Sequence, residues 1–206
     1  MMRTRLSFFA ILLFNSMPLT VPAQDRPLDY ATQLASLKAG DTAIDYGRLR
    51  LSWVDSPEYK LAKDTKKEED AMGAALEQKN YAEALKNAEV VLASEYVNMD
   101  AHFAAYVANR ELGQPDQAEF HKTVFRGLVN SIVNSGDGRS TDKAWVVINT
   151  HEEYVVLRVL GYKPGGQSLM HKDGHAYDVM KVKNVEDETD ATFYFNVDIP
   201  MKHYGV

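Results

Sequence analysis

The sequence predicts an α+β protein in which helical hairpins precede a small antiparallel β-sheet module with one helix. Up to about residue 134, apolar residues recur at the spacing of one helix face, and two turn-like segments lie 34 residues apart. Farther on, β-branched and aromatic runs flank an Asp-Gly pair, which is typical of a tight β-hairpin. We therefore expect a helical region over 24–134 and an α+β module over 135–206.

The two turn-like segments begin at Lys79 and Gly113, and each separates two helical apolar patterns. A 34-residue period is that of tetratricopeptide (TPR) hairpins, which stack because one hairpin cannot bury its own apolar face. Ala84 and Ala118 fall at equivalent positions, where a small side chain lets two helices approach closely. Tyr96 stands where a repeat usually ends in proline. The pattern favours about two degenerate TPR-like repeats, with a generic helical bundle as the alternative.

Further helices are expected on either side of the first turn. The stretch from Leu28 to Leu37 has helical spacing and ends at Gly40. Asp41 or Thr42 is expected to cap a second helix. The remaining helices are predicted to restart at Ser56-Pro57, to span Asp64–Gln78, and to follow Asn80, Asn98 and Pro115.

In the second half, the clearest signal is the pair Asp173-Gly174 between two strand-like runs. A two-residue turn there places Lys172 opposite His175, and Met170 opposite Tyr177. Other expected elements are a buried strand over Trp145–Ile148, a helix over Glu152–Leu160, a turn at Pro164-Gly165-Gly166 and a last strand over Thr192–Val197. About four strands with one covering helix follow from this pattern.

The first 23 residues have the pattern of an export signal. Arg3 and Arg5 precede an apolar run over Leu6–Phe14, and Val21-Pro22-Ala23 offers the small residues that a signal peptidase reads. The run is about half the roughly 20 residues that span a bilayer. We expect cleavage after Ala23 and a periplasmic or secreted protein without stable membrane insertion, although a retained anchor is the open alternative.

Composition restricts the chemistry and the partners. The chain has no cysteine, so disulfides, thiol catalysis and a lipid-modified N-terminal cysteine are excluded. Its formal net charge is −6, and cleavage would remove two arginines and no acidic residue. This excess repels phosphates and anionic lipids, so nucleic acid is not an expected partner.

Four short motifs occur in the same order as in a family of exported bacterial proteins. They are Ser135-Gly136-Asp137-Gly138, Glu153-Tyr154, Gly166-Gln167-Ser168-Leu169 and Tyr194-Phe195-Asn196-Val197. The chain thereby resembles the family catalogued as domain of unknown function 4919. The resemblance implies helical hairpins followed by an α+β end in a secreted or periplasmic protein. It supplies no established activity and no catalytic residues.

No catalytic, metal-binding or cofactor-binding residues are predicted. His151-Glu152 begins like a zinc protease motif, but Val155 stands where the second histidine would be needed. His171, Asp173 and His175 surround the hairpin tip, yet the two histidines lie on opposite sheet faces if Asp173-Gly174 is the turn. A solvated hairpin is the favoured interpretation.

The first functional hypothesis is a non-catalytic envelope protein that binds a protein or peptide. Phe103, Val107 and Arg110 share one face of the first helix of the second hairpin, so they are the candidates for a binding groove. A purely structural module in a secreted assembly is not separable from this hypothesis by sequence.

The alternative is an enzyme of unknown type with a site between the helical and sheet halves. Asp137, Glu153 and Gln167 are its candidate residues. The hypothesis requires that these side chains converge in one pocket with a raised carboxyl pKa. The competing interpretation is that Asp137 is solvated and that Glu153 only complements the start of its helix.

Overall fold

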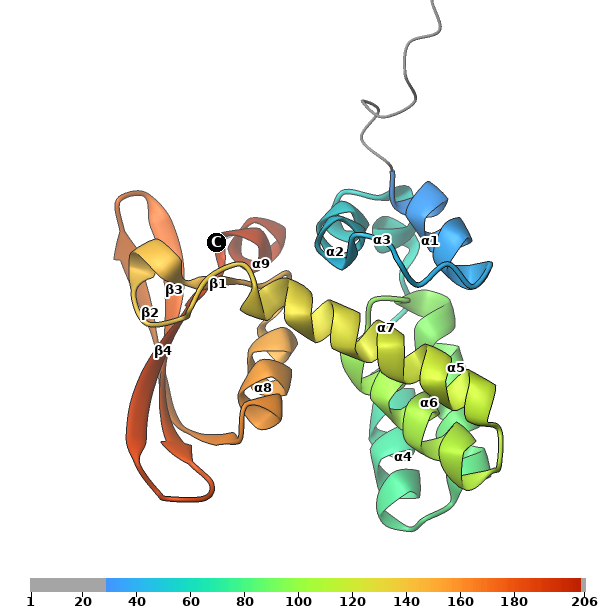
Figure 1. The fold of residues 1–206 in the computed structure, drawn as a ribbon. Helices are drawn as coiled ribbons and strands as arrows, with labels where there is room; N and C mark the ends of the chain where they lie inside the picture. The colour runs from blue at the N-terminus through green and yellow to red at the C-terminus, as the bar shows by residue number, and fades with distance from the viewer. Residues whose placement is uncertain (1–28, 205–206) are drawn as a thin grey trace, which may run out of the picture.

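The computed structural model describes residues 29–204, so the predicted export signal lies outside the described residues (Figure 1). Helices form the first part of this range, and a four-stranded sheet with further helices forms the second. The predicted α+β class is confirmed. No helix within residues 29–204 combines the length and apolarity needed to cross a bilayer.

Seven α-helices of residues 29–204 precede the sheet, and most begin at a capping residue. The side chains of Asp29, Asp45, Ser56, Asn80 and Asn98 each accept a hydrogen bond from an N–H in the first turn of the helix that follows. The helices are α1 (Tyr30–Lys38), α2 (Tyr46–Val54), α3 (Pro57–Leu61), α4 (Lys66–Glu77), α5 (Tyr81–Ser94), α6 (Met99–Glu111) and α7 (Pro115–Val133).

The cap predicted for α2 was wrong. Asp45 caps this helix through the N–H of Arg48. Asp41 instead accepts from the N–H of Ala43 within the preceding loop. Asp41 and Thr42 lie too early in the chain to reach the first turn.

Helices α4 to α7 form two consecutive hairpins whose neighbouring helices pack together (Figure 1). Ala84 is 0% exposed and Ala118 is 5% exposed, as expected for residues at close helix contacts. Ala101, Ala104 and Ala105 on α6 belong to the same kind of interface. The small residues therefore let the hairpins stack closely, while the TPR assignment itself stays a prediction.

The sheet contains β1 (Trp145–Val146), β2 (Tyr162–Lys172), β3 (His175–Asn184) and β4 (Asp190–Asn196) in the order β1-β4-β3-β2. The pairs β2–β3 and β3–β4 are antiparallel, but β1 runs parallel to β4. The predicted antiparallel sheet is thus mixed. Because a long crossover through α8 and the β2–β3 hairpin separates β1 from β4, β1 can enter the edge in the same direction as β4.

The predicted hairpin register is confirmed, since Lys172 pairs with His175 and Met170 with Tyr177. Asp173 and Gly174 have φ values of 53° and 81°, as the two-residue turn requires. The turn predicted at Pro164-Gly165-Gly166 was wrong. This segment lies inside β2, where the register shifts by a bulge that takes up the extra residue.

Two α-helices accompany the sheet where one was predicted. Helix α8 (Thr150–Val159) lies between the sheet and the helical hairpins, and α9 (Asp198–Tyr204) follows β4 (Figure 1). A short 3-10 helix, η1 (Thr141–Lys143), precedes β1. One apolar core runs from Tyr30 on α1 through the valines of α8 to Val197. The core therefore joins the two parts, while the predicted boundary at residue 134 stays a prediction.

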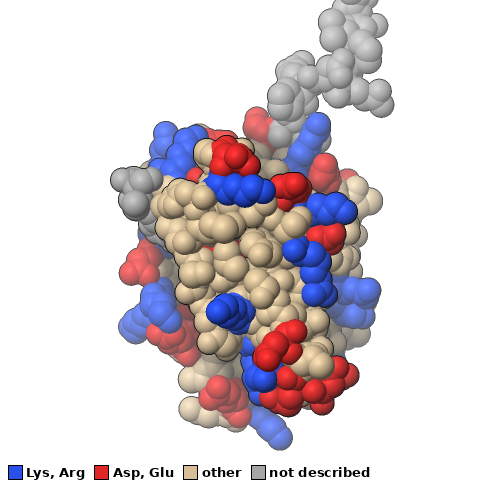
Figure 2. Space-filling model, turned by 90° about the vertical axis from the view of Figure 1, so that its left-hand side faces the viewer, with Lys and Arg blue, Asp and Glu red and all other residues tan. Residues whose placement is uncertain are grey.

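The middle of the outer face of the sheet is poor in charge. In Figure 2 a broad area without acidic or basic side chains occupies the middle of this side of the molecule, with charged groups around it. Register places Met170 and Tyr177 together on one sheet face, and Val179 with Tyr194 beside them. The opposite face of the sheet packs against α8.

Candidate functional site

The candidate site is a cleft of about 510 Å³ between α4, α6 and α8. Its apolar lining comes from Met72 and Leu76 on α4 and from Phe103 on α6. The ring of Phe103 packs against the rings of Tyr106 and Phe125, with centroid-to-centroid distances of 6.2 and 5.4 Å. Phe103 is 39% exposed, so it offers an accessible but fixed aromatic surface. We call this space the cleft.

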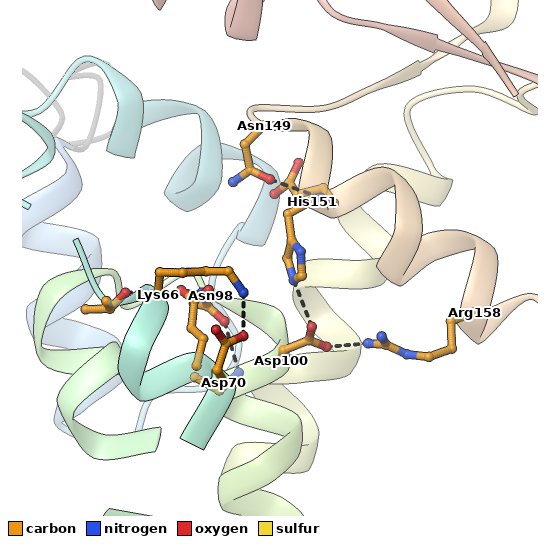
Figure 3. A network of polar contacts seen from close by, with 11 residues as sticks. Lys66, Asp70, Asn98, Asp100, Asn149, His151 and Arg158 are labelled. Carbon is orange, nitrogen blue, oxygen red and sulfur yellow. Dashed lines mark hydrogen bonds and ion pairs between the residues drawn. The ribbon is translucent and has the colours of Figure 1, made fainter. Parts of the chain in front are cut away.

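Asp100 in the first turn of α6 connects the cleft to α8 (Figure 3). Its Oδ2 atom accepts from His151 Nε2 at 2.7 Å, and its Oδ1 atom accepts from Arg158 Nη2. His151 and Arg158 lie seven residues apart, which places them two turns apart on one face of α8. One carboxylate thus holds both ends of α8 against α6.

The local charges change the pKa values of this group. Burial alone would raise the pKa of Asp100, but the bond from His151 and the charge of Arg158 lower it below its usual value. The bond to Asp100 raises the pKa of His151, against the opposing effect of burial. Both shifts favour the charged forms and hence the ion pair.

The opposite wall of the cleft belongs to α4. Lys66 and Asp70 form an exposed ion pair one turn apart on this helix (Figure 3). Glu69 uses its Oε1 atom to accept from Thr65 Oγ1 at 3.1 Å and from Asn98 Nδ2 at 3.4 Å. Asn98 also caps α6, so this bond ties the start of α6 to α4.

Glu95 lies just before α6, next to the polar lining of the cleft. Burial, together with the charges of Glu152 and Glu69, raises its pKa to about 7, while His151 and a bond from Asn98 oppose the shift. A carboxyl group with this pKa is half-ionised at neutral pH. It is therefore the described carboxyl of this region that is best suited to exchange protons.

The residues predicted for the binding groove meet the cleft only in part. Phe103 lines it. Val107, one turn later, is half-buried, and Arg110 is exposed outside the lining. The guanidinium of Arg110 bonds instead to Glu111 and to the Tyr106 hydroxyl. The face shared by these residues leaves the cleft after one turn because α6 continues past α8.

The residues predicted for the alternative site do not converge. Asp137 is exposed in the loop before η1, where it accepts from the N–H of Arg139 and lies 3.5 Å from Lys143. Glu153 and Gln167 do meet under α8, and Gln167 Nε2 donates to Glu153 Oε2 at 3.4 Å. Asp137 is therefore not part of one site with them.

The group around Glu153 contains a second carboxyl that the sequence did not indicate. Gln167 Nε2 donates to Asp178 Oδ2 at 2.6 Å, and the Tyr154 hydroxyl donates to Gln167 Oε1 at 2.8 Å. Glu153 is 0% exposed, and its Oε1 atom has no hydrogen-bond partner among the described residues. Burial and the adjacent Asp178 raise the pKa of Glu153 to about 9. Asn149 caps α8, and Glu153 lies in the first turn of this helix, as expected, with its side chain beside Gln167.

A buried ion pair next to the cleft was also missed. Arg50 on α2 donates from Nη1 to Glu152 Oε2 at 2.7 Å, and both side chains are almost fully buried. Arg50 Nη2 donates further to the Val146 carbonyl at 3.1 Å. This pair fixes α8 and β1 to the helical part and thereby sets one wall of the cleft.

Sequence reasoning missed most of the polar lining. The charged residues of this lining come from three segments that are far apart in the sequence: Lys66 and Glu69, then Asp100, then His151 and Arg158. The one local signal was the His151–Arg158 spacing on a helix face. Within residues 29–204, no group of three or more histidine, aspartate or glutamate side chains is arranged to hold a metal ion.

The chain belongs to a protein family of unknown function. The sequence profile of the family described as "Domain of unknown function (DUF4919)" matches residues 29–205. The resemblance seen in the four ordered motifs is thereby confirmed. No curated protein matches the chain, and no solved structure matches it.

Proposed function

We propose that the protein is a non-catalytic binding module that holds a peptide segment of another protein in the cleft. The observation that carries this proposal is Phe103, an accessible aromatic side chain in the lining of a cleft with charged groups on both sides. Protein-binding clefts combine a central apolar anchor with a polar rim in this way.

The architecture of the cleft supports the same proposal. Helices α4 and α6 are the first helices of consecutive hairpins, and these are the helices that line the inner surface when TPR-like hairpins stack. Helix α8 then takes the place of a further hairpin on the other side. Two TPR-like units would be closed by the α+β part instead of by a third repeat.

We further propose that the protein acts in the periplasm or outside the cell after cleavage behind Ala23. The support is the charge and apolar pattern of residues 1–23. N-terminal sequencing of the protein recovered from the periplasmic fraction tests this step. An N-terminus that still includes Arg3 would contradict cleavage.

Selection from a displayed library of random peptides tests peptide binding. Peptides selected on residues 24–206 are expected to lose about tenfold or more in affinity to Phe103→Asp, because a buried apolar contact contributes roughly 1–3 kcal/mol. Leu112→Asp is the matched control, since Leu112 is 41% exposed at the end of the same helix and outside the cleft. Calorimetry measures the affinities, and circular dichroism checks folding.

The proposal fails if no peptide is selected, or if the selected peptides tolerate Phe103→Asp as well as Leu112→Asp. A second variant, Phe103→Ala, keeps the test informative if the aspartate variant does not fold. It is expected to weaken binding less than Phe103→Asp because it introduces no charge.

A second candidate function is acid–base catalysis in the same region. The specific observation is Glu95, whose pKa of about 7 suits a general acid or base at neutral pH. Hydrolysis of a panel of nitrophenyl esters, glycosides and phosphates tests it. A turnover that Glu95→Gln abolishes would replace the non-catalytic proposal, whereas unchanged background rates with all substrates would exclude these reaction classes.

A further inference from the structure

Most charged side chains of the cleft already have a partner within the protein. Lys66 pairs with Asp70, and Asp100 accepts from both His151 and Arg158. These contacts cancel much of the charge of the lining. A charged ligand would therefore bind to those atoms of the lining that have no hydrogen-bond or ion-pair partner among the described residues.

Two side chains on opposite walls keep such atoms. Among the contacts of residues 29–204, Arg158 donates only from Nη2, so Nε and Nη1 remain for a second carboxylate. On the α4 wall, Glu69 accepts only through Oε1, so Oε2 remains for a donor. Both residues line the cleft.

The net charges of the two walls have opposite signs, which match the signs of these remaining atoms. On the α8 side, His151 and Arg158 share one carboxylate, that of Asp100, so protonated His151 leaves an excess positive charge. On the α4 side, Lys66 is opposed by Asp70 and Glu69, which leaves an excess negative charge. Phe103 lies at the apolar part of the lining.

From this arrangement we infer that the cleft selects a dipolar peptide segment, in which an apolar residue is flanked by one acidic and one basic side chain. The apolar residue packs on Phe103, the acidic side chain bonds to Arg158, and the basic side chain bonds to Glu69. A planar guanidinium suits a carboxylate because two parallel N–H bonds can form. This inference rests on the proposed binding function and adds the chemistry of the ligand.

Synthetic peptides that differ only in charge test the inference. The probes have a leucine flanked by aspartate and lysine in a glycine–serine context, with both peptide ends capped. Matched probes replace the aspartate by asparagine, the lysine by glutamine, or both. The dipolar peptide is expected to bind about tenfold tighter than the neutral one at low ionic strength, and salt should reduce this advantage. NMR titration detects affinities down to the millimolar range.

Two protein variants assign the contacts. Arg158→Gln should remove the preference for aspartate and leave the preference for lysine, whereas Glu69→Gln should do the reverse. Arg110→Gln is the matched control, because Arg110 is also exposed but lies outside the cleft. Such a double cycle separates a direct contact from a general charge effect.

The possible outcomes distinguish the inference from the proposed function. If the neutral peptide binds as tightly as the dipolar one and both depend on Phe103, the inference is wrong and peptide binding stands. Equal loss of both preferences in Arg158→Gln, Glu69→Gln and Arg110→Gln would also overturn it. If library selection finds no Phe103-dependent peptide at all, the proposed function itself fails.

Discussion

The helical part and the sheet part each place two like titratable side chains next to one another, at least one of them fully buried, but with different consequences. In the helical part, His102 on α6 faces His121 on α7, with 3.0 Å between their Nδ1 atoms. In the sheet part, Glu153 on α8 lies beside Asp178 on β3. The two histidines form their hydrogen bond while both are neutral, whereas Glu153 in the carboxyl pair stays protonated at neutral pH.

The histidine pair has a defined tautomer. His102 Nε2 lies 2.9 Å from the Tyr96 carbonyl, which can only accept, so His102 carries its proton on Nε2. Its Nδ1 atom then accepts from His121 Nδ1–H. Burial lowers the pKa of His102 to about 3, with a further contribution from His121, and burial lowers the pKa of His121 to about 4. Both rings are therefore neutral at neutral pH.

The carboxyl pair behaves in the opposite way. Glu153 stays protonated up to about pH 9, because burial and the neighbouring Asp178 carboxyl raise its pKa. Neutral imidazoles thus suit a helix contact at pH 7, whereas two buried carboxyls carry a free-energy cost that grows as the pH rises. The Arg50–Glu152 pair joins the two parts and avoids this cost by opposite charges.

The largest expected effect comes from breaking the junction between the two parts. Arg50→Met should lower the free energy of unfolding by about 3–5 kcal/mol, because Glu152 would stay buried without its partner. Urea unfolding followed by tryptophan fluorescence measures the loss. The double variant Arg50→Met/Glu152→Met is the control and should recover most of it. A single variant as stable as the original protein would show that the pair does not couple the parts.

An intermediate effect is expected from acidification of the histidine pair. Below about pH 6.5, His102 and His121 become protonated in the unfolded chain but stay neutral in the folded protein. The free energy of unfolding therefore falls with decreasing pH. Between pH 7 and pH 5 the loss should be on the order of 3 kcal/mol for the two groups. His121→Asn keeps a donor toward His102 and should reduce this slope by about half. An unchanged slope in that variant would contradict the assigned pKa values.

The smallest effect in the series has the opposite sign. The folded pKa of Glu153 lies above its usual value of 4.5, so its contribution to stability is complete below about pH 4.5 and is lost as the pH rises toward 9. Glu153→Gln should therefore stabilise the protein at pH 8 by on the order of 2 kcal/mol. The gain should vanish near pH 4, where Glu153 is protonated in the folded protein and carries no more charge than the glutamine that replaces it. Destabilisation at pH 8 would indicate that Glu153 accepts a bond that glutamine cannot replace.

Local patterns predicted the parts of the fold that depend on neighbours in sequence. Asp173-Gly174 defined the β2–β3 register because only few residues accept two successive positive φ values. The segment Pro164-Gly165-Gly166 also has turn-forming residues. Strand β2 nevertheless continues through it, because pairing with β3 across a bulge outweighs the turn tendency. Helix α9 was missed because it is short and ends the described chain.

The candidate site was predictable only at Phe103. Its face on α6 was recognisable from the spacing of apolar residues, but Val107 and Arg110 share that face and do not reach the cleft. The partners of Asp100 lie 51 and 58 residues farther along the chain. No local pattern relates positions at such separations.

Sequence patterns alone predicted the α+β class, the stacked helices with small residues at their contacts, and the tip of the β-hairpin. These features follow from short-range periodicity and from backbone preferences of single residues. Three features became visible only in the folded protein: the parallel pairing of β1 with β4, the cleft that α8 closes against α4 and α6, and the contacts between buried charged groups. Such contacts depend on how whole elements pack, and burial then sets the protonation of the side chains that they bring together.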